Sequence, residues 1–441
     1  MFSEKDIQNY IWKNKDEFSQ LIIGDIPKVD VEFGEKIDSN KIFQKIIFER
    51  LSETLKYTNF MDLIGVEVPL NKINDSTIRA DFLGVNIEDV GISVIELKKS
   101  RQTERQAFTE LLAYSNHLIS LFPTMMKDDI IYILISPMEE RIVREAFLHA
   151  LLVDNKRVIA FIPTFQDETR IDSLKLRLWI PNENDIVSFK NHHFSKNNFE
   201  VFKIVWRDIP SDSDSKEDPN DEDKMFMNSI SSFVAQIMEE KNIHGFCFTS
   251  QSWPELKMLY PNSLIIIGMN PYEISFKNLY ADNGYKDNLS SLRYNSFSAK
   301  LNDIITGLKL EENHVDYLEN LYLGWSSNLI KIGLDSMKFL FKNVDGKDVS
   351  FDYGIFSWEE YISSSIEYTY CFNYEVFPTG ALRKLHSEIL KLDYEFIAEN
   401  GLNEHPIYGD VFHLLIDSYY SHYFFDVFLG RMLGLDVEDL S

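Results

Sequence analysis

The chain has 441 residues, of which 44% are hydrophobic and 14% aromatic. A chain of this length and composition can build two or three domains with buried cores, which excludes a wholly disordered, collagen-like or coiled-coil protein. The two cysteines, Cys247 and Cys371, are too few for a disulfide framework or a cysteine-based zinc site. No apolar run approaches the roughly 20 residues that span a bilayer, and the N-terminus lacks a signal-peptide pattern. We therefore expect a soluble, cytoplasmic protein.

The net charge is −26, which argues against a passive nucleic-acid coat because phosphate binding needs Lys and Arg. The charge is unevenly spread. Residues 1–209 hold 27 basic and 33 acidic residues, whereas residues 226–441 hold 15 basic and 30 acidic residues. The first half is therefore the better candidate for contact with phosphate groups.

A strongly acidic segment separates the two halves. Residues 210–224, PSDSDSKEDPNDEDK, contain seven acidic residues and no apolar residue except two prolines. Such a segment cannot bury enough surface to offset the entropy of ordering it. We predict a domain over 1–209, an acidic flexible linker over 210–225 and a second domain over 226–441.

Helix and strand patterns alternate through the first half. Periodicity and turn residues predict the following order: helix 41–57, strands 65–70, 78–86 and 91–98, helix 103–122, strand 129–136, helix 138–154 and strand 157–164. A short antiparallel meander is thus followed by a βαβ crossover. This order predicts an α/β domain with a mixed sheet flanked by helices. Strands near 174–180 and 199–206 are expected to extend that sheet.

The second half is predicted to be mostly helical. A βαβ unit over 245–269 opens it, and helices are predicted over 288–309, 313–342, 356–368, 380–399 and 407–434. Basic residues are scarce among its aromatic side chains, so stacking on nucleic-acid bases is disfavoured. We expect this half to bind a protein partner or a second copy of the chain, or to act as a sensor.

Charged residues interrupt two apolar strands of the first half. Asp81 lies in RADFLG, and Glu96 and Lys98 share one face of the following strand, VIELKK. If the two strands pair as a hairpin, two carboxylates and one amine meet at the end of the sheet. Acids in such patterns are common on protein surfaces, but charge within apolar strands is costly and therefore favours a functional cluster. Two carboxylates suit Mg²⁺ or Mn²⁺, and the lysine would orient or deprotonate water and stabilise charge on phosphorus.

These residues resemble the PD-(D/E)xK nuclease superfamily, which has the restriction-endonuclease-like fold. The segments RADFLGVN and GISVIELKKS match its second and third motifs, with Asp81, Glu96 and Lys98 at the catalytic positions and Ala80 where proline is usual. The resemblance covers residues 41–136. It implies a helix-flanked mixed sheet and a metal-dependent phosphodiesterase.

The same resemblance assigns the metal ligands and supporting residues. It implies that Asp81 and Glu96 hold the metal ion, with the Leu97 carbonyl as a further ligand. An acid from the first helix often joins such sites, and Glu49 and Glu53 are the candidates here.

The helix after the motif, IELKKSRQTERQAFTELLAYSNHL, resembles the motif region of NucS-like and RecB-like nucleases. Those enzymes often place a glutamine four residues before an aromatic residue of this helix. Glu110 holds that position in this chain, and Gln106 lies one turn earlier on the same stripe. Lys99 and Arg101 directly follow the motif and are candidates for nucleic-acid contact.

The resulting hypothesis is a Mg²⁺- or Mn²⁺-dependent endo- or exodeoxyribonuclease. DNA is favoured over RNA as the substrate, and the fusion to a non-catalytic domain suggests restriction or anti-phage defence by analogy. Two alternatives come from other classes. One is a catalytically inactive nuclease fold that serves as a binding module, and the other is a regulatory assembly protein that acts mainly through its helical half.

Overall fold

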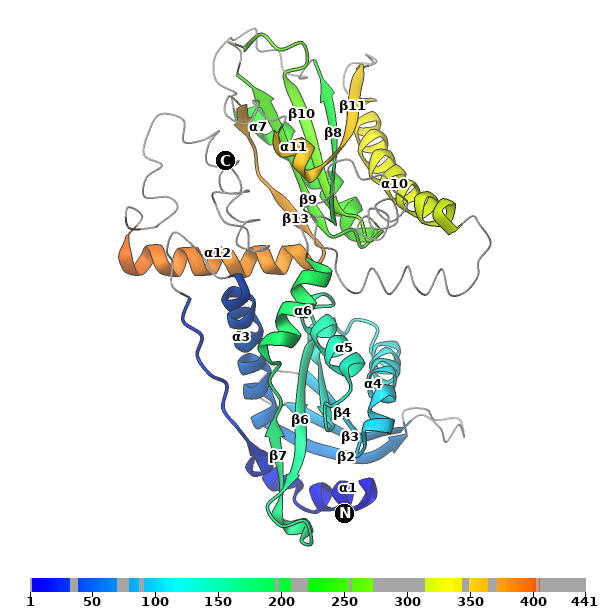
Figure 1. The fold of residues 1–441 in the computed structure, drawn as a ribbon, viewed down its shortest axis with the longest axis vertical. Coiled ribbons are helices and arrows are strands. Elements are labelled where there is room, and N and C mark those ends of the chain that lie inside the picture. Colours follow the sequence, from blue (N-terminus) through cyan, green and yellow to red (C-terminus); the bar gives the residue numbers. More distant parts are fainter. Residues whose placement is uncertain are drawn as a thin grey trace. The chain divides into compact units, whose positions relative to one another are not determined.

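The computed structural model of the chain describes residues 2–31, 39–69, 79–86, 91–194, 198–207, 221–253, 256–272, 314–342, 349–363, 371–401 and 404. The chain divides into two compact units, one formed by residues 1–31 and 40–189 and the other by residues 32–39 and 190–441. Each unit contains its own β-sheet (Figure 1).

The first unit is built on a seven-stranded mixed sheet with the order β1-β7-β6-β5-β4-β3-β2. Its strands are β1 (Ile22–Ile23), β2 (Met61–Pro69), β3 (Arg79–Asn86), β4 (Gly91–Leu97), β5 (Ile130–Ile135), β6 (Arg157–Phe165) and β7 (Leu174–Leu178). Strands β2, β3 and β4 form an antiparallel meander, and β4, β5 and β6 run parallel. The meander and the βαβ crossover predicted from the sequence are thus confirmed.

Helices cover both faces of this sheet. They are α1 (Glu4–Lys13), α2 (Phe18–Leu21), α3 (Ser39–Asn59), α4 (Arg101–Leu121), α5 (Arg141–Leu152) and α6 (Glu183–His193), and short 3-10 turns lie at Lys15–Glu17, Lys127–Asp129 and Ile171–Ser173. Helices α4 and α5 pack together on one face. On the other face, Ile7 and Ile11 of α1 join a core with alternate residues of the strands, among them Phe82 and Ile95.

The central strand β5 explains why the sheet needs cover on both faces. All six residues of Ile130–Ile135 are buried, as expected for a parallel strand between two layers of helices. The crossover from β4 to β5 is made by α4, which buries Ala107, Leu111 and Leu118 along one stripe. This crossover places α4 over the strand that carries Glu96.

Several boundaries in the first unit differ from the sequence prediction. Helix α4 begins at Arg101 after its N-cap residue Ser100, not at Thr103. Strand β2 begins at Met61, four residues before the predicted start. A bulge between Leu63 and Gly65 interrupts the alternation of side chains there, so the first residues of the strand do not show a strand pattern. Helices α1 and α2 were not predicted.

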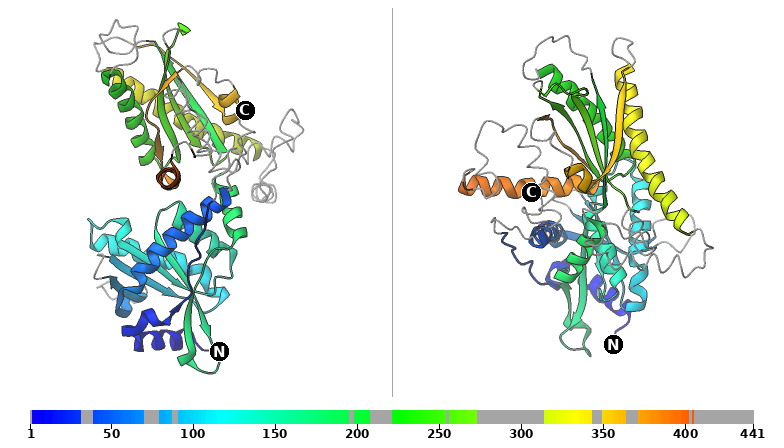
Figure 2. Two further views of the ribbon diagram at one scale, coloured as in Figure 1. Left: turned by 90° about the vertical axis from the view of Figure 1, so that its left-hand side faces the viewer. Right: turned by 45° about the horizontal axis from the view of Figure 1, so that its top comes forward.

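The second unit contains a six-stranded antiparallel sheet with the order β11-β8-β10-β9-β12, and β13 also pairs with β9. The strands are β8 (Phe199–Trp206), β9 (Gly245–Ser252), β10 (Asn262–Met269), β11 (Phe351–Ser357), β12 (Cys371–Asn373) and β13 (Phe377–Thr379). Helices α7 (Asp221–Glu240) and α10 (His314–Lys342) cover one face of it (Figure 2). Helices α11 (Trp358–Ser363) and α12 (Ala381–Asn400) complete the described elements.

Two sequence expectations about this sheet are wrong. Strand 199–206 does not extend the first sheet but pairs with β10 and β11, since a strand pattern carries no information about its pairing partner. The βαβ unit predicted over 245–269 is an antiparallel pair, because the connection of nine residues is shorter than a parallel crossover requires. A mostly helical second domain is therefore corrected to helices packed on a central sheet.

Other predictions for the second half fall only partly on described residues. Helices 313–342 and 380–399 are confirmed as α10 and α12, and residues 288–309 and 407–434 lie outside the described residues. Most of the predicted linker also lies outside them, and its last residues, from Asp221, begin α7. Across the part of the chain that the structure describes, no helix is long and apolar enough to cross a membrane.

Replacing either of two glycines of the second unit by alanine should change the free energy of unfolding, in opposite directions. A Cβ at Gly245 in β9 would lie 1.9 Å from the backbone oxygen of Ile267, whereas a Cβ at Gly324 in α10 meets no atom within 4 Å. We expect Gly245→Ala to lower the free energy of unfolding by about 1–3 kcal/mol, because the strand pair must separate. Gly324→Ala should raise it by about 0.5–1 kcal/mol, because alanine favours a helix interior. Urea unfolding of both variants checks this, and equal effects would contradict it.

Candidate functional site

The register of β3 and β4 brings the two predicted carboxylates face to face. Phe82 pairs with Ile95, so the next position along the hairpin sets Asp81 opposite Glu96. Opposed residues of an antiparallel pair lie on the same face of the sheet, and Lys98 follows Glu96 by two residues on that face. The hairpin predicted between these segments is confirmed by its pairing through Asn86 and Gly91.

The backbone hydrogen bonds between β3 and β4 end at the site, and the side chain of Asp81 provides the next acceptor. Asp81 Oδ2 accepts a hydrogen bond from the backbone N–H of Leu97 at 2.8 Å. Asp81 Oδ1 accepts a second one from Gln8 Nε2 of helix α1 at 3.1 Å. A side-chain carboxylate thus replaces the backbone acceptor where β3 leaves β4, which fixes the position of Asp81 at the end of the strand.

Lys98 lies between two glutamates. Its Nζ donates to Glu96 Oε1 and forms an ion pair with Glu110 Oε2 of helix α4 at 2.5 Å. Its backbone N–H donates to the Ile135 carbonyl of β5 at 2.8 Å, which fixes the end of β4 against its parallel neighbour. Glu96 is only 2% exposed and Lys98 only 9%. This buried lysine therefore joins β4 to α4.

Burial dominates the electrostatics of the two strand carboxyls. It raises the pKa of Asp81 to about 6, against the lowering effect of the Leu97 N–H and the charge of Lys98. Burial, the hydrogen bond to Glu110 and the charge of Asp81 raise the pKa of Glu96 to about 10, which Lys98 only partly offsets. Without a further cation, Glu96 is therefore protonated at neutral pH.

Glu110 and Lys98 shift toward their charged forms. Burial opposes ionisation of Glu110, but its hydrogen bonds to Glu96 and Lys98 outweigh that effect and lower its pKa. Burial also opposes the charge of Lys98, and the hydrogen bonds to Glu110 and Glu96 outweigh it, so the pKa of Lys98 is raised. Lys98 is thus an ammonium group at neutral pH, which suits it to donate hydrogen bonds and to balance negative charge.

The cluster carries an excess of negative charge when its acids are ionised. Asp81, Glu96 and Glu110 supply three negative charges and Lys98 supplies one positive charge. Glu96 Oε2 is buried, and among the described residues it meets no hydrogen-bond donor. The two unbalanced charges can be offset by protons, one of which Glu96 then shares with Glu110, or by one divalent cation.

Within the described ranges, no group of three or more His, Cys, Asp or Glu side chains is arranged to hold a metal ion. Mg²⁺ commonly takes only one or two protein carboxylates and completes its shell with water and phosphate oxygens. Asp81 and Glu96 supply two such carboxylates, and their joint binding of the ion stays a prediction. The Leu97 carbonyl stays a predicted ligand.

The supporting residues predicted on helices divide into two groups. Glu110 contacts Lys98, whereas Gln106 is exposed one turn earlier on α4. On α3, Glu49 is exposed and forms an ion pair with Lys45 at 3.8 Å, and Glu53 is exposed. The structure thus brings Glu110 to the cluster, and a role for the α3 acids stays a prediction.

The two predicted nucleic-acid contacts follow directly after Lys98. The backbone N–H of Lys99 donates to Glu4 Oε2 of α1 at 3.3 Å, and its side chain is half-buried. The side chain of Arg101 is exposed and pairs with Glu140. Both are therefore placed at the end of β4 that carries the site.

Sequence reasoning missed Gln8 and Glu4 near the cluster, and it gave no role to Tyr114, the aromatic residue four positions after Glu110. Gln8 donates to Asp81, and the charge of Glu4 contributes to the raised pKa of Asp81. Tyr114 of α4 is buried, and burial followed by the charges of Glu96 and Glu110 raises the pKa of its phenol. The signal for the first two was present at Ser3, which opens α1 with a capping box.

No family model, curated protein or solved structure matches this chain.

The raised pKa values predict that the metal-free site destabilises the fold as pH increases. The folded chain holds protons on Glu96 and Asp81 that the unfolded chain releases above about pH 4, so stability falls between pH 4 and pH 8. Glu96→Gln mimics the protonated acid and removes this cost. In EDTA at pH 8 we expect the variant to be more stable than the wild type by about 1 kcal/mol or more, with a smaller difference at pH 5.

Thermal unfolding from pH 5 to pH 8 measures this difference, which corresponds to a rise of about 2–4 °C in melting temperature per kcal/mol. Glu183→Gln, at an exposed position of α6, is the matched control and should follow the wild type. A Glu96→Gln variant that is less stable than the wild type at pH 8 would contradict the conclusion that burial raises the pKa of Glu96.

Proposed function

We propose that the chain is a metal-dependent nuclease that hydrolyses phosphodiester bonds, most simply in DNA. The observation that carries the proposal is the buried cluster of Asp81, Glu96, Glu110 and Lys98, whose ionised form lacks two positive charges. A divalent cation and a phosphate group together complete such a site. Mg²⁺ is the proposed ion, and Mn²⁺ has the same ligand preferences.

The order of elements around the cluster supports the PD-(D/E)xK resemblance. Helix α3, the antiparallel strands β2, β3 and β4, helix α4 and the parallel strand β5 follow one another in the predicted order, and they build a mixed sheet flanked by helices, as the resemblance implies. Asp81 lies on the second of these strands and Glu96 on the third. A shared arrangement of elements does not by itself imply a shared reaction, so the proposal rests on the side chains.

In the proposed reaction, water attacks phosphorus in line with the bond to the 3′ oxygen. That bond breaks, the leaving oxygen takes up a proton, and the products are a 5′ phosphate and a 3′ hydroxyl. When bound by Asp81 and Glu96, the metal ion supplies Lewis-acid chemistry and neutralises charge. The protein itself holds the two carboxylates in place, Asp81 through Leu97 and Gln8, and Glu96 through Lys98.

Lys98 is assigned an electrostatic role. Its raised pKa keeps the amine charged, which disfavours proton abstraction by its nitrogen. A fixed ammonium group beside the carboxylates can instead stabilise the negative charge that builds on phosphoryl oxygens in the transition state. Glu110 keeps this ammonium in position from α4.

The second unit is proposed to bind a protein partner or a second copy of the chain. Residues 226–441 carry twice as many acidic as basic residues, so this half repels phosphate. The fusion of a nuclease to such a unit supports a role in restriction or anti-phage defence, by analogy. A catalytically inactive binding module is the alternative, and cleavage assays decide between them.

We expect Asp81→Asn and Glu96→Gln each to reduce Mg²⁺-dependent cleavage of plasmid and single-stranded DNA by at least about 100-fold. Each change nearly keeps the shape of the side chain but removes a charge from a site that must hold a dication. Gel assays with Mg²⁺, Mn²⁺ or EDTA measure the loss. The exposed Asp62→Asn on β2 is the matched control and should cut like the wild type.

Lys98→Ala separates binding from chemistry within the same experiment. It should keep calorimetric binding of Mg²⁺ while its single-turnover rate falls, because its role is in the transition state. Wild-type cleavage by Asp81→Asn or Glu96→Gln would refute the site. No cleavage by the wild-type chain under any metal condition would favour the inactive binding module.

Glu110 and Gln106 give a paired prediction on one helix. Glu110→Ala removes an ion-pair partner of Lys98 and should lower the cleavage rate about tenfold, the scale of one lost charged hydrogen bond. Gln106→Ala changes an exposed side chain and should leave the rate unchanged. Single-turnover kinetics at saturating Mg²⁺ measure both. Wild-type rates for both variants would show that these two side chains of α4 contribute only packing.

A further inference from the structure

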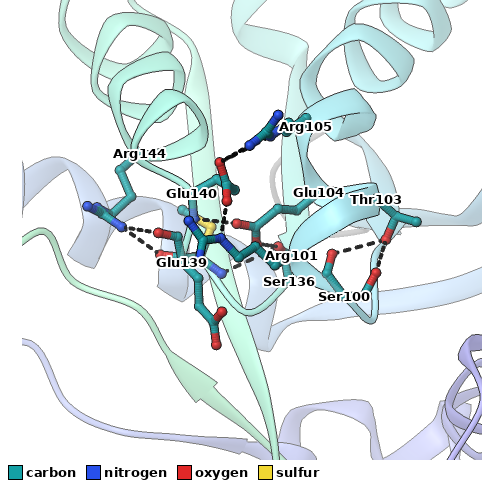
Figure 3. A network of polar contacts seen from close by, with 10 residues as sticks. Ser100, Arg101, Thr103, Glu104, Arg105, Ser136, Glu139, Glu140 and Arg144 are labelled. Carbon is teal, nitrogen blue, oxygen red and sulfur yellow. Dashed lines mark hydrogen bonds and ion pairs between the residues drawn. The ribbon is translucent and has the colours of Figure 1, made fainter.

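A second polar network lies just beyond Lys98, at the start of α4 (Figure 3). Arg101 and Arg105 are one helical turn apart and therefore lie on the same face of the helix. Both donate to one carboxylate, that of Glu140. Arg101 Nε donates to Glu140 Oε1, and Arg105 Nε and Nη2 donate to Glu140 Oε2 at 3.1 and 2.8 Å.

Glu140 is itself held by a buried acid. The backbone N–H of Glu140 donates to Glu104 Oε1, and the Ser136 hydroxyl donates to Glu104 Oε2 at 2.8 Å. Glu104 lies on α4 between the two arginines and is 0% exposed, and the Glu140 side chain is 9% exposed. The loop after β5 is thus tied to the first turns of α4, and the carboxylate that the arginines share cannot move freely.

The arginines keep much of their hydrogen-bonding capacity. Their side chains are 67% and 63% exposed. The hydrogen bonds to Glu140 use one of the five N–H donors of Arg101 and two of those of Arg105. The carboxylate of Glu140 is the shared acceptor of both guanidinium groups, and their remaining N–H groups face solvent. The pair is therefore preorganised to take a second anion from solvent.

The charges around the pair are mixed, so an anion must be attracted by the exposed guanidinium groups themselves. Lys99 adds one positive charge, whereas Glu139, which is exposed in the loop after β5, and the buried Glu104 each subtract one. Arg144 is engaged elsewhere, with the Met138 and Glu139 carbonyls and with Asp185. The positive end of the α4 dipole also favours an anion here.

The network lies at the end of the sheet that carries the candidate site. Leu97 pairs with Ile135, so the end of β4 and the loop after β5 are adjacent. Arg101 follows Lys98 by three residues and Glu140 follows Ile135 by five, so both partners of the network come directly after the paired strand ends that carry the candidate site. A nucleic-acid strand with one phosphate at the catalytic cluster can then reach the arginines with a phosphate further along its backbone.

We propose that Arg101 and Arg105, held side by side by Glu140, form a binding subsite for a non-scissile backbone phosphate of the nucleic-acid strand. Planar guanidinium groups match phosphate oxygens with paired N–H donors, which a lysine cannot do. The inference rests on the proposed nuclease function and deepens it, because it assigns the strand a second point of contact beside the cleaved bond.

The test compares Arg101→Ala and Arg105→Ala with Arg177→Ala in the full chain. Arg177 is an exposed arginine of β7, three strands from β4 in the sheet, so the control removes the same charge elsewhere on the unit. Fluorescence anisotropy in EDTA measures binding of a labelled oligonucleotide, single-stranded and duplex, over a range of salt. Single-turnover cleavage in Mg²⁺ measures the half-saturating enzyme concentration and the maximal rate.

We expect each subsite variant to weaken binding about tenfold and to lower the slope of log affinity against log salt by about 1. The half-saturating concentration should rise, while the maximal rate stays within about twofold of the wild type. Arg177→Ala should match the wild type. If the wild type cuts DNA but the subsite variants behave like Arg177→Ala, the subsite is refuted and the nuclease function stands. If the wild type neither binds nor cuts nucleic acid, both fall.

Discussion

Charge balance around the buried Glu96 carboxyl is the constraint on which the candidate site depends. Three carboxyl groups meet one ammonium group where water has little access. A fold does not retain such a deficit without compensation, because unpaired buried charge costs several kcal/mol. Protons provide that compensation in the metal-free protein, at the expense of stability at neutral pH, and a bound dication would release them. Binding of such a cation would therefore be linked to folding through the same few atoms.

The fold produces this cluster by two ordinary features of sheet geometry. The pairing of β3 with β4 stops at Phe82, and the carboxylate of the preceding residue, Asp81, accepts the N–H of Leu97 at that point. The β4–α4–β5 crossover then brings Glu110 over the same face. Residues separated by nearly thirty positions thus meet at one strand end, and the scaffold beneath them is a fully buried parallel strand, β5.

Some of these elements and contacts can be predicted from the sequence, and the others cannot, for physical reasons. Periodicity identifies α4 and β5 because their apolar residues are buried in regular patterns. The alternation around Asp81 and Glu96 also predicts their shared face, since side-chain direction in a strand has a fixed period of two. The partner of a strand, in contrast, is a long-range property. Strand β8 reads as a continuation of the first sheet but joins the second, and β9 and β10 pair with each other.

The missed parts of the site follow from the same limit. Gln8 lies 73 positions before Asp81, and no local pattern links a polar residue of the first helix to the end of β3. Gln106 and Glu110 are one turn apart on the same side of α4. Which of them reaches the cluster depends on how the helix packs against the sheet, and the sequence pattern does not determine that. The two paired arginines are likewise visible only once the loop after β5 places Glu140 beside them.

The buried Glu104 affects how mutagenesis of this chain must be interpreted. It is an acid on the helix next to the cluster, yet its two oxygens are used by the Glu140 N–H and the Ser136 hydroxyl and so serve the architecture of the loop. A search for essential acids that records only lost activity would group it with Asp81 and Glu96. Spectroscopic measurement of folding separates the two classes, because loss of Glu104 loosens the scaffold, whereas loss of the strand acids leaves it intact.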